Sequence, residues 1–79
     1  MVAVVFKIYS KDGEFDNAVS QLKKLGPAGS QTEEIGFGIK IIKALFKFDD
    51  AQNSSSKIEE QIRALPAVQE VEVMEESLI

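Results

Sequence analysis

Hydrophobic residues in this chain follow two periods, and the order in which these periods alternate restricts the fold. Residues 2–10 alternate with a period of two, which predicts a β-strand, and residues 39–48 do the same over a longer stretch. Apolar residues at helical spacing over residues 15–25 predict a helix, for which Asp12 offers an N-cap. Residues 30–35 are polar and short, and they fit another strand.

The second half of the chain repeats the change of period. After a polar loop, the sequence predicts a second helix, capped by Ser55 or Ser56, and then a strand over residues 68–74 with Val71 and Val73 facing the core. The predicted order is therefore β-α-β-β-α-β. This order is typical of the α+β ferredoxin-like split βαβ sandwich, a four-stranded antiparallel sheet with two helices on one face and an open second face.

Length and composition narrow the classes of function. The chain has 79 residues, enough for one domain over residues 1–79, and 44% of them are hydrophobic, as in an ordinary globular protein. It contains no cysteine or histidine, so we expect no disulfide, no thiol or imidazole catalysis and no metal site. The apolar runs are too short to cross a membrane, and no signal peptide opens the chain. We therefore expect a cytoplasmic protein that binds no membrane.

Neither catalysis nor nucleotide binding is indicated. Acidic residues occur in doublets, but adjacent side chains point apart on a strand or helix and rarely converge on one substrate. The doublets are Glu33-Glu34, Asp49-Asp50, Glu59-Glu60 and Glu75-Glu76. The chain also has no glycine-rich phosphate loop followed by lysine and serine or threonine. We therefore predict that it is not an enzyme, binds no nucleotide itself and needs no cofactor.

The segment Gly36-Phe37-Gly38 places a large aromatic residue between two glycines, directly before the long apolar strand. Glycine weakens a strand and usually marks a bend or a close approach of the backbone. The ring of Phe37 is therefore expected to be displayed. Its target could be the core of the domain itself, a nucleobase or another protein.

RNA binding is one alternative, because the RNA-recognition motif shares this element order and carries a similar Gly-Phe-Gly segment on its third strand. The match is partial. Ile35 stands where a basic residue belongs, and the second stacking aromatic is missing. Glu70 and Glu72 are expected beside Tyr9 and Lys7 on the open face, where they would repel phosphate. The net charge of -4 also argues against direct binding of nucleic acid.

A protein partner is the other alternative, and here a family resemblance becomes specific. The chain combines residues 35–40 (IGFGIK), a strand that ends in Asp49-Asp50, and a helix containing residues 57–62 (KIEEQI). Together these segments resemble the guanine-nucleotide-exchange domain of elongation factor 1-beta. The similarity is greatest over residues 34–61. Because the chain starts at its first strand, it resembles the short archaeal form.

The resemblance implies a partner and a binding site. The partner would be the translational GTPase elongation factor 1-alpha, from which the domain would release GDP so that GTP can enter. Phe37 would anchor the complex, Gly36 and Gly38 would allow its exposure, and Ile39 and Lys40 would border the contact. An orphan interaction module or an RNA-binding module of the same fold remains the alternative function. For the individual residues, the alternatives are that Phe37 is an ordinary core residue and that Lys40 is only solvated.

The C-terminal tail departs from the family pattern. Eukaryotic members have a lysine next to last, where its ammonium can displace magnesium, whereas this chain has Leu78. We expect Leu78 and Ile79 to pack against the partner as an apolar wedge, with Glu75 and Glu76 at most perturbing the magnesium site. Alternatively, the tail completes the fourth strand or frays.

Overall fold

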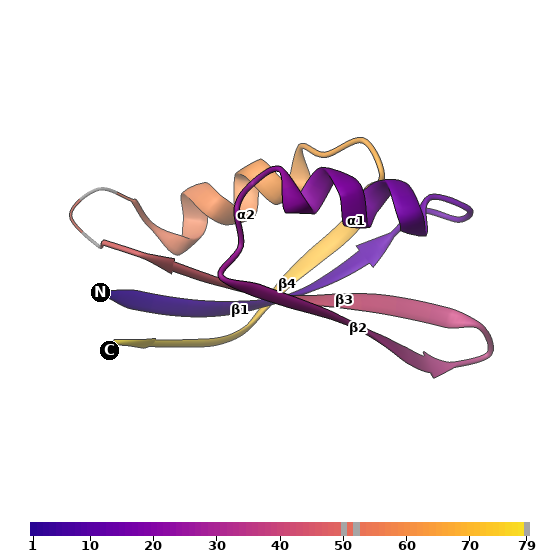
Figure 1. The fold of residues 1–79 in the computed structure, drawn as a ribbon, viewed down its shortest axis with the longest axis horizontal. Coiled ribbons are helices and arrows are strands. Elements are labelled where there is room, and N and C mark those ends of the chain that lie inside the picture. Colours follow the sequence, from indigo (N-terminus) through magenta and orange to yellow (C-terminus); the bar gives the residue numbers. More distant parts are fainter. Residues whose placement is uncertain (50, 52, 79) are drawn as a thin grey trace.

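The chain forms one antiparallel sheet with both helices on the same side of it (Figure 1). In the computed structural model, which describes residues 1–49, 51 and 53–78, the order is β-α-β-β-α-β. The elements are β1 (Val2–Ser10), α1 (Phe15–Lys23), β2 (Gly29–Gly36), β3 (Ile39–Phe48), α2 (Ser55–Arg63) and β4 (Val68–Leu78). The strands lie in the order β2-β3-β1-β4, and all neighbours are antiparallel. The predicted ferredoxin-like split βαβ sandwich is confirmed.

The core lies between the helices and one face of the two middle strands. Val4, Phe6 and Ile8 of β1 are fully buried, as their alternation predicts. The rings of Phe6 and Phe46 meet edge to face, with centroids 5.8 Å apart and planes at 77°. The helices contribute the buried side chains of Ala18, Leu22, Ile58 and Ile62. These side chains belong to one hydrophobic cluster, so the sandwich has one shared core. Burial of each large side chain stabilises the fold by about 1.5–3 kcal/mol.

The first helix begins later than its sequence suggests. Asp12 was the expected N-cap, but the N-cap position belongs to Glu14, whose side chain makes no capping hydrogen bond. Gly13 has a φ of 74°, and the Glu14 amide donates to the Lys11 carbonyl over 2.9 Å. This turn occupies the residues around Asp12, so the prediction of that cap is wrong.

The second helix is capped by the side chain of Ser54, one residue before the predicted Ser55. The Ser54 hydroxyl accepts a hydrogen bond from the Lys57 amide over 3.3 Å. Ser55 and Ser56 lie inside the helix. A serine cap binds the amide two or three residues later, and three serines in succession leave its position open in the sequence.

In the edge strand β4, one of the two valines predicted to face the core is not buried. Val71 is buried, but Val73 keeps 45% of its surface exposed. Val73 pairs with Phe6, and the preceding residue of β1, Val5, pairs with Glu75, so Met74 is an extra residue in β4. This bulge lies where the strand forms the edge of the sheet, and an edge position receives cover from one side only.

The two ends of β3 mark the two ends of the molecule. Ile39 follows the β2–β3 turn, whereas Phe48 pairs with Val2, which in turn pairs with Leu78. At 3.3 Å per residue, β3 spans about 30 Å. The long axis of the molecule measures 39 Å, and Figure 1 shows the β2–β3 turn at its right end and both chain termini at its left end. This arrangement decides how far apart the predicted site residues lie.

Candidate functional site

Phe37 and Gly38 form the two-residue turn between β2 and β3. Their φ angles are 54° and 75°, and the flanking Gly36 and Ile39 are paired across the hairpin. Positive φ at both turn residues is typical of a type I′ turn, which matches the twist of the strands and favours Asn-Gly or Gly-Gly. Among the described residues, Phe37 is the only one other than glycine with a positive φ. The aromatic residue is therefore held in a backbone conformation that is unfavourable for it.

The glycine before the turn is required by the backbone. The pairing register shifts between Glu34 and Gly36, so Ile35 is an extra residue in β2, and Gly36 has a φ of 109°. A Cβ atom built on Gly36 or Gly38 would meet nothing within 4 Å. Space is therefore available, and it is the left-handed backbone that excludes larger residues.

The side chain of Phe37 is fully exposed. Its relative exposure is 104%, whereas the other phenylalanines are buried or pack against the core. These are Phe6, Phe15, Phe46 and Phe48. The alternative that Phe37 is an ordinary core residue is wrong for this structure, because the ring contacts none of the core.

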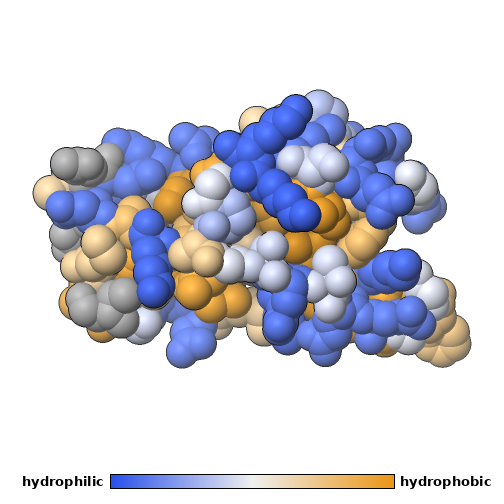
Figure 2. All heavy atoms as spheres, in the orientation of Figure 1, coloured by the Kyte–Doolittle hydropathy of each residue, from blue (hydrophilic) through white to orange (hydrophobic). Residues whose placement is uncertain are grey.

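Two isoleucines extend the apolar surface around Phe37. Ile35 is 48% exposed and Ile39 is 50% exposed. We call Ile35, Phe37 and Ile39 the apolar tip. Figure 2 shows hydrophobic atoms at the lower right, where the β2–β3 hairpin ends. Ile39 was predicted as part of the site, but Ile35 was not, because its exposure depends on the register shift in β2. An exposed apolar cluster of this kind is typical of an interaction site.

Lys40 lies beside the apolar tip but faces the other way. Along β3 it alternates with Ile39, and its ammonium lies 5.4 Å from the centre of the Phe15 ring at the start of α1. Lys40 is exposed, yet it contacts an aromatic face within the same chain. Of the two residues predicted to border the contact, Ile39 therefore lies on the open face and Lys40 on the helix face.

A hollow of about 380 Å³ separates the hairpin from the turn that joins β1 to α1. Figure 2 shows a notch on the right, between the helix layer above and the hairpin below. The hollow is lined by Ser10, Lys11, Asp12, Gly13, Phe15, Phe37, Gly38, Ile39 and Lys40. The side of the hairpin that faces α1 is thus open to a partner as well as to water.

Leu78 lies at the far end of the molecule from Phe37. It is the last residue of β4, pairs with Val2 and keeps 78% of its surface exposed. Together with Val2 and Phe48 it lines a second hollow, of about 320 Å³. Ile79 lies outside the described residues. As far as Leu78, the tail completes the fourth strand, as in the alternative to an apolar wedge against the partner.

The open face of the sheet carries acids beside its aromatic residue, as the sequence predicts. Glu70 is opposite Tyr9, and Glu72 is opposite Lys7. The Lys7 ammonium lies 5.5 Å from the centre of the Tyr9 ring. The pKa of Lys7 is raised, mainly by Tyr9 and further by Glu72 and Glu33. Within the described residues, Tyr9 has no second stacking aromatic beside it on this surface, and Glu70 and Glu72 would repel the phosphates of RNA.

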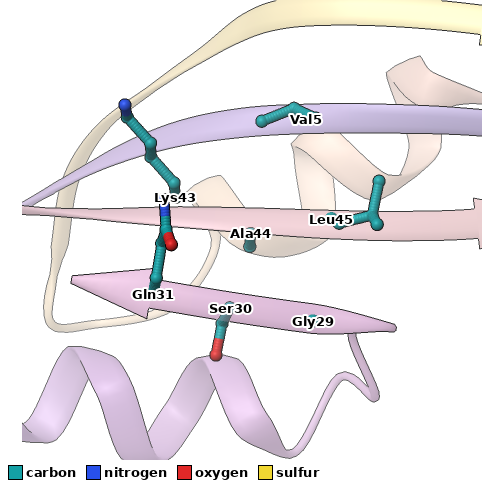
Figure 3. A pocket seen from close by; sticks show the side chains of 7 residues that line it. All are labelled: Val5, Gly29, Ser30, Gln31, Lys43, Ala44 and Leu45. Atoms are coloured by element: carbon teal, nitrogen blue, oxygen red, sulfur yellow. The ribbon is translucent and has the colours of Figure 1, made fainter.

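On the same face of the sheet, an ion pair joins the neighbouring strands β2 and β3. Lys43 lies 2.7 Å from Glu33, and this contact lowers the pKa of the Glu33 carboxyl. Beside it is a shallow hollow of about 300 Å³, shown in Figure 3, where Gly29 leaves space next to Leu45 and Val5. Ser30, Gln31, Lys43 and Ala44 complete the lining of this hollow.

Comparisons with known proteins agree with the motif and the fold. The sequence model of the "EF-1 guanine nucleotide exchange domain" family matches residues 3–79. Elongation factor 1-beta of Aeropyrum pernix is 31% identical over 80 residues, which cover 91% of this chain and 89% of that protein. In the described part of the chain, neither helix has the length and apolar character needed to cross a membrane. This chain belongs to the family of EF-1 guanine nucleotide exchange domains.

Proposed function

We propose that this protein is the guanine-nucleotide exchange factor of elongation factor 1-alpha, from which it promotes release of GDP and rebinding of GTP. The observation that carries the proposal is the full exposure of Phe37 on a conformationally unfavourable turn, in a chain of the exchange-domain family. A ring that contacts nothing in its own fold is available to a partner. The factor would work in the cytoplasm, and it would need no cofactor and carry out no covalent chemistry.

Exchange without chemistry follows from linkage between two ligands. The factor must bind the nucleotide-free GTPase more tightly than the GDP complex, and GDP and factor then weaken each other equally. Each tenfold weakening of GDP binding needs about 1.4 kcal/mol of differential contact. An aromatic side chain seated in a partner pocket contributes on the order of 2 kcal/mol or more. The apolar tip can therefore supply a large share of the binding energy.

We propose that the GTPase contacts this protein at both ends. The hairpin contributes Phe37 between its two glycines, with Ile39 and Lys40 at the border of the contact. Leu78 lies about 30 Å away along β3 at the rise of an extended strand. Its exposed side chain, together with Ile79, would reach the nucleotide domain of the GTPase. Because Leu78 carries no charge, it would act there by apolar packing.

Glu75 and Glu76 are two acidic groups near this end. Both are exposed on β4, and Glu76 lines the hollow that Leu78 shares with Val2. A carboxylate close to the partner's magnesium site would change the field around the ion. We assign these residues at most this perturbing role.

Release of nucleotide tests the proposed function. Elongation factor 1-alpha from the same organism is loaded with a fluorescent GDP analogue and chased with unlabelled GTP, with and without this protein. We expect the protein to accelerate release at substoichiometric concentration, since an exchange factor turns over. Equal rates with and without the protein would contradict the proposal.

A further inference from the structure

The turn that carries Phe37 projects beyond the main sheet. The last pair between β1 and β3 is Tyr9 with Ile41, whereas β2 and β3 remain paired as far as Gly36 with Ile39. Residues 34–40 therefore form a ribbon of two strands without a third neighbour. A two-stranded ribbon is marginally stable in water, so the direction of the apolar tip needs additional support.

Phe15 supplies such support through a contact with Lys40 of the hairpin. It is the first residue of α1 and packs against the core, which fixes its ring. The Lys40 ammonium lies 5.4 Å from the centre of that ring, and Lys40 is paired with Glu34 across the projecting ribbon. Phe15 also lines the hollows on both sides of Lys40. The ring is thus anchored in the body of the protein and touches the base of the hairpin.

We propose that Phe15 is a positioning residue, whose aromatic face holds Lys40 and thereby limits the motion of the turn that presents Phe37. A cation is attracted to the face of an aromatic ring but not to an aliphatic side chain. Leucine at position 15 could still cover the core, whereas it could not hold the ammonium. The effect on partner binding rests on the function proposed above, but the effect on the free hairpin does not.

Amide hydrogen exchange on the free protein measures the bracing directly. We expect Phe15→Leu to increase opening of residues 34–40 about two- to fivefold, the factor for one exposed cation–π contact. Phe15→Tyr keeps the aromatic face and should show the same protection of residues 34–40 as the wild type. In a Lys40→Met background, Leu and Tyr at position 15 should give equal protection. Val19→Ala, on the same helix and also packed against the core, is the control that leaves the hairpin unchanged.

The exchange assay then tests the consequence for the partner. Phe15→Leu should raise the concentration of factor needed for half-maximal GDP release by the same two- to fivefold, with the maximal rate unchanged. Equal hairpin protection in Phe15→Leu and Phe15→Tyr would overturn the proposal, as would additive effects of Phe15→Leu and Lys40→Met. If the wild type fails to accelerate release, the proposed function fails, and the hydrogen exchange result alone decides the role of Phe15.

Discussion

Phe37 occupies a backbone position that suits asparagine or glycine better than an aromatic residue. Its φ is 54°, and its side chain is fully exposed. No packing contact within the fold therefore offsets the cost of this backbone conformation. The left-handed conformation costs an ordinary residue about 1–2 kcal/mol. A residue that strains its own fold without contacting it is best explained by contacts outside the fold.

Phe37→Asn should therefore stabilise the protein. Asparagine followed by glycine fits a type I′ turn, and we expect the free energy of unfolding to rise by about 0.5–1 kcal/mol. Urea denaturation measures this change. A lower stability would mean that the ring packs against the protein in solution, contrary to its exposure.

The turn glycines should not tolerate a side chain. Gly36→Ala places a Cβ on a residue with φ of 109°, and we expect it to destabilise the fold by about 1 kcal/mol or more. Gly29→Ala is the matched control, because Gly29 lies in the same strand, has no positive φ and also has open space around it. Its effect should stay within about 0.5 kcal/mol in the same denaturation experiment. Equal losses in the two variants would contradict the backbone argument.

Strands with long hydrophobic alternation were predictable from the sequence, whereas helix caps and the register between strands were not. β1 and β3 have the predicted bounds, because long alternation leaves no other assignment. The cap at Asp12 was wrong because a local turn competes for the same residues. The exposure of Val73 and Ile35 depends on register shifts between strands, which are tertiary properties that a single segment does not encode.

The pairing of β2 with β3 should depend on pH through Glu33. Its pKa is lowered by Lys43, so the ion pair contributes stability above the ordinary carboxyl value of 4.5 and loses it as pH falls through the lowered value. The stability difference between wild type and Glu33→Gln should therefore be larger at pH 7 than at pH 3. Glu34→Gln is the control, because Glu34 forms no ion pair among the described residues. A difference that stays constant with pH would contradict this role of the pair.

At the scale of the whole molecule, the candidate site consists of two regions instead of one. The sequence identified Phe37 and Leu78 separately, but it contains no direct measure of their distance. The fold places them at opposite ends of the long axis, which measures 39 Å. A partner that touches both must extend along the molecule, and each contact can then serve a different step of exchange.

The two ends should therefore differ in their kinetic effects. Phe37→Ala removes an anchor and should raise the concentration of factor at half-maximal GDP release, whereas Leu78→Ser should mainly lower the maximal rate. In the double variant the two free-energy changes should add, because the sites share no contacts. Titration of each variant in the release assay measures both parameters. The same change of parameter in both variants would argue for a single function of the two ends.

Phe37→Asn in the release assay shows whether Phe37 anchors the partner, because this variant is expected to fold at least as stably as the wild type. Fluorescent GDP release from elongation factor 1-alpha is followed with equal concentrations of the two proteins, after their folded state has been verified by circular dichroism. We expect the wild type to accelerate release and the folded variant to lose at least about tenfold in efficiency, which corresponds to about 1.4 kcal/mol of lost contact. A folded variant that accelerates release as well as the wild type would contradict this role of Phe37.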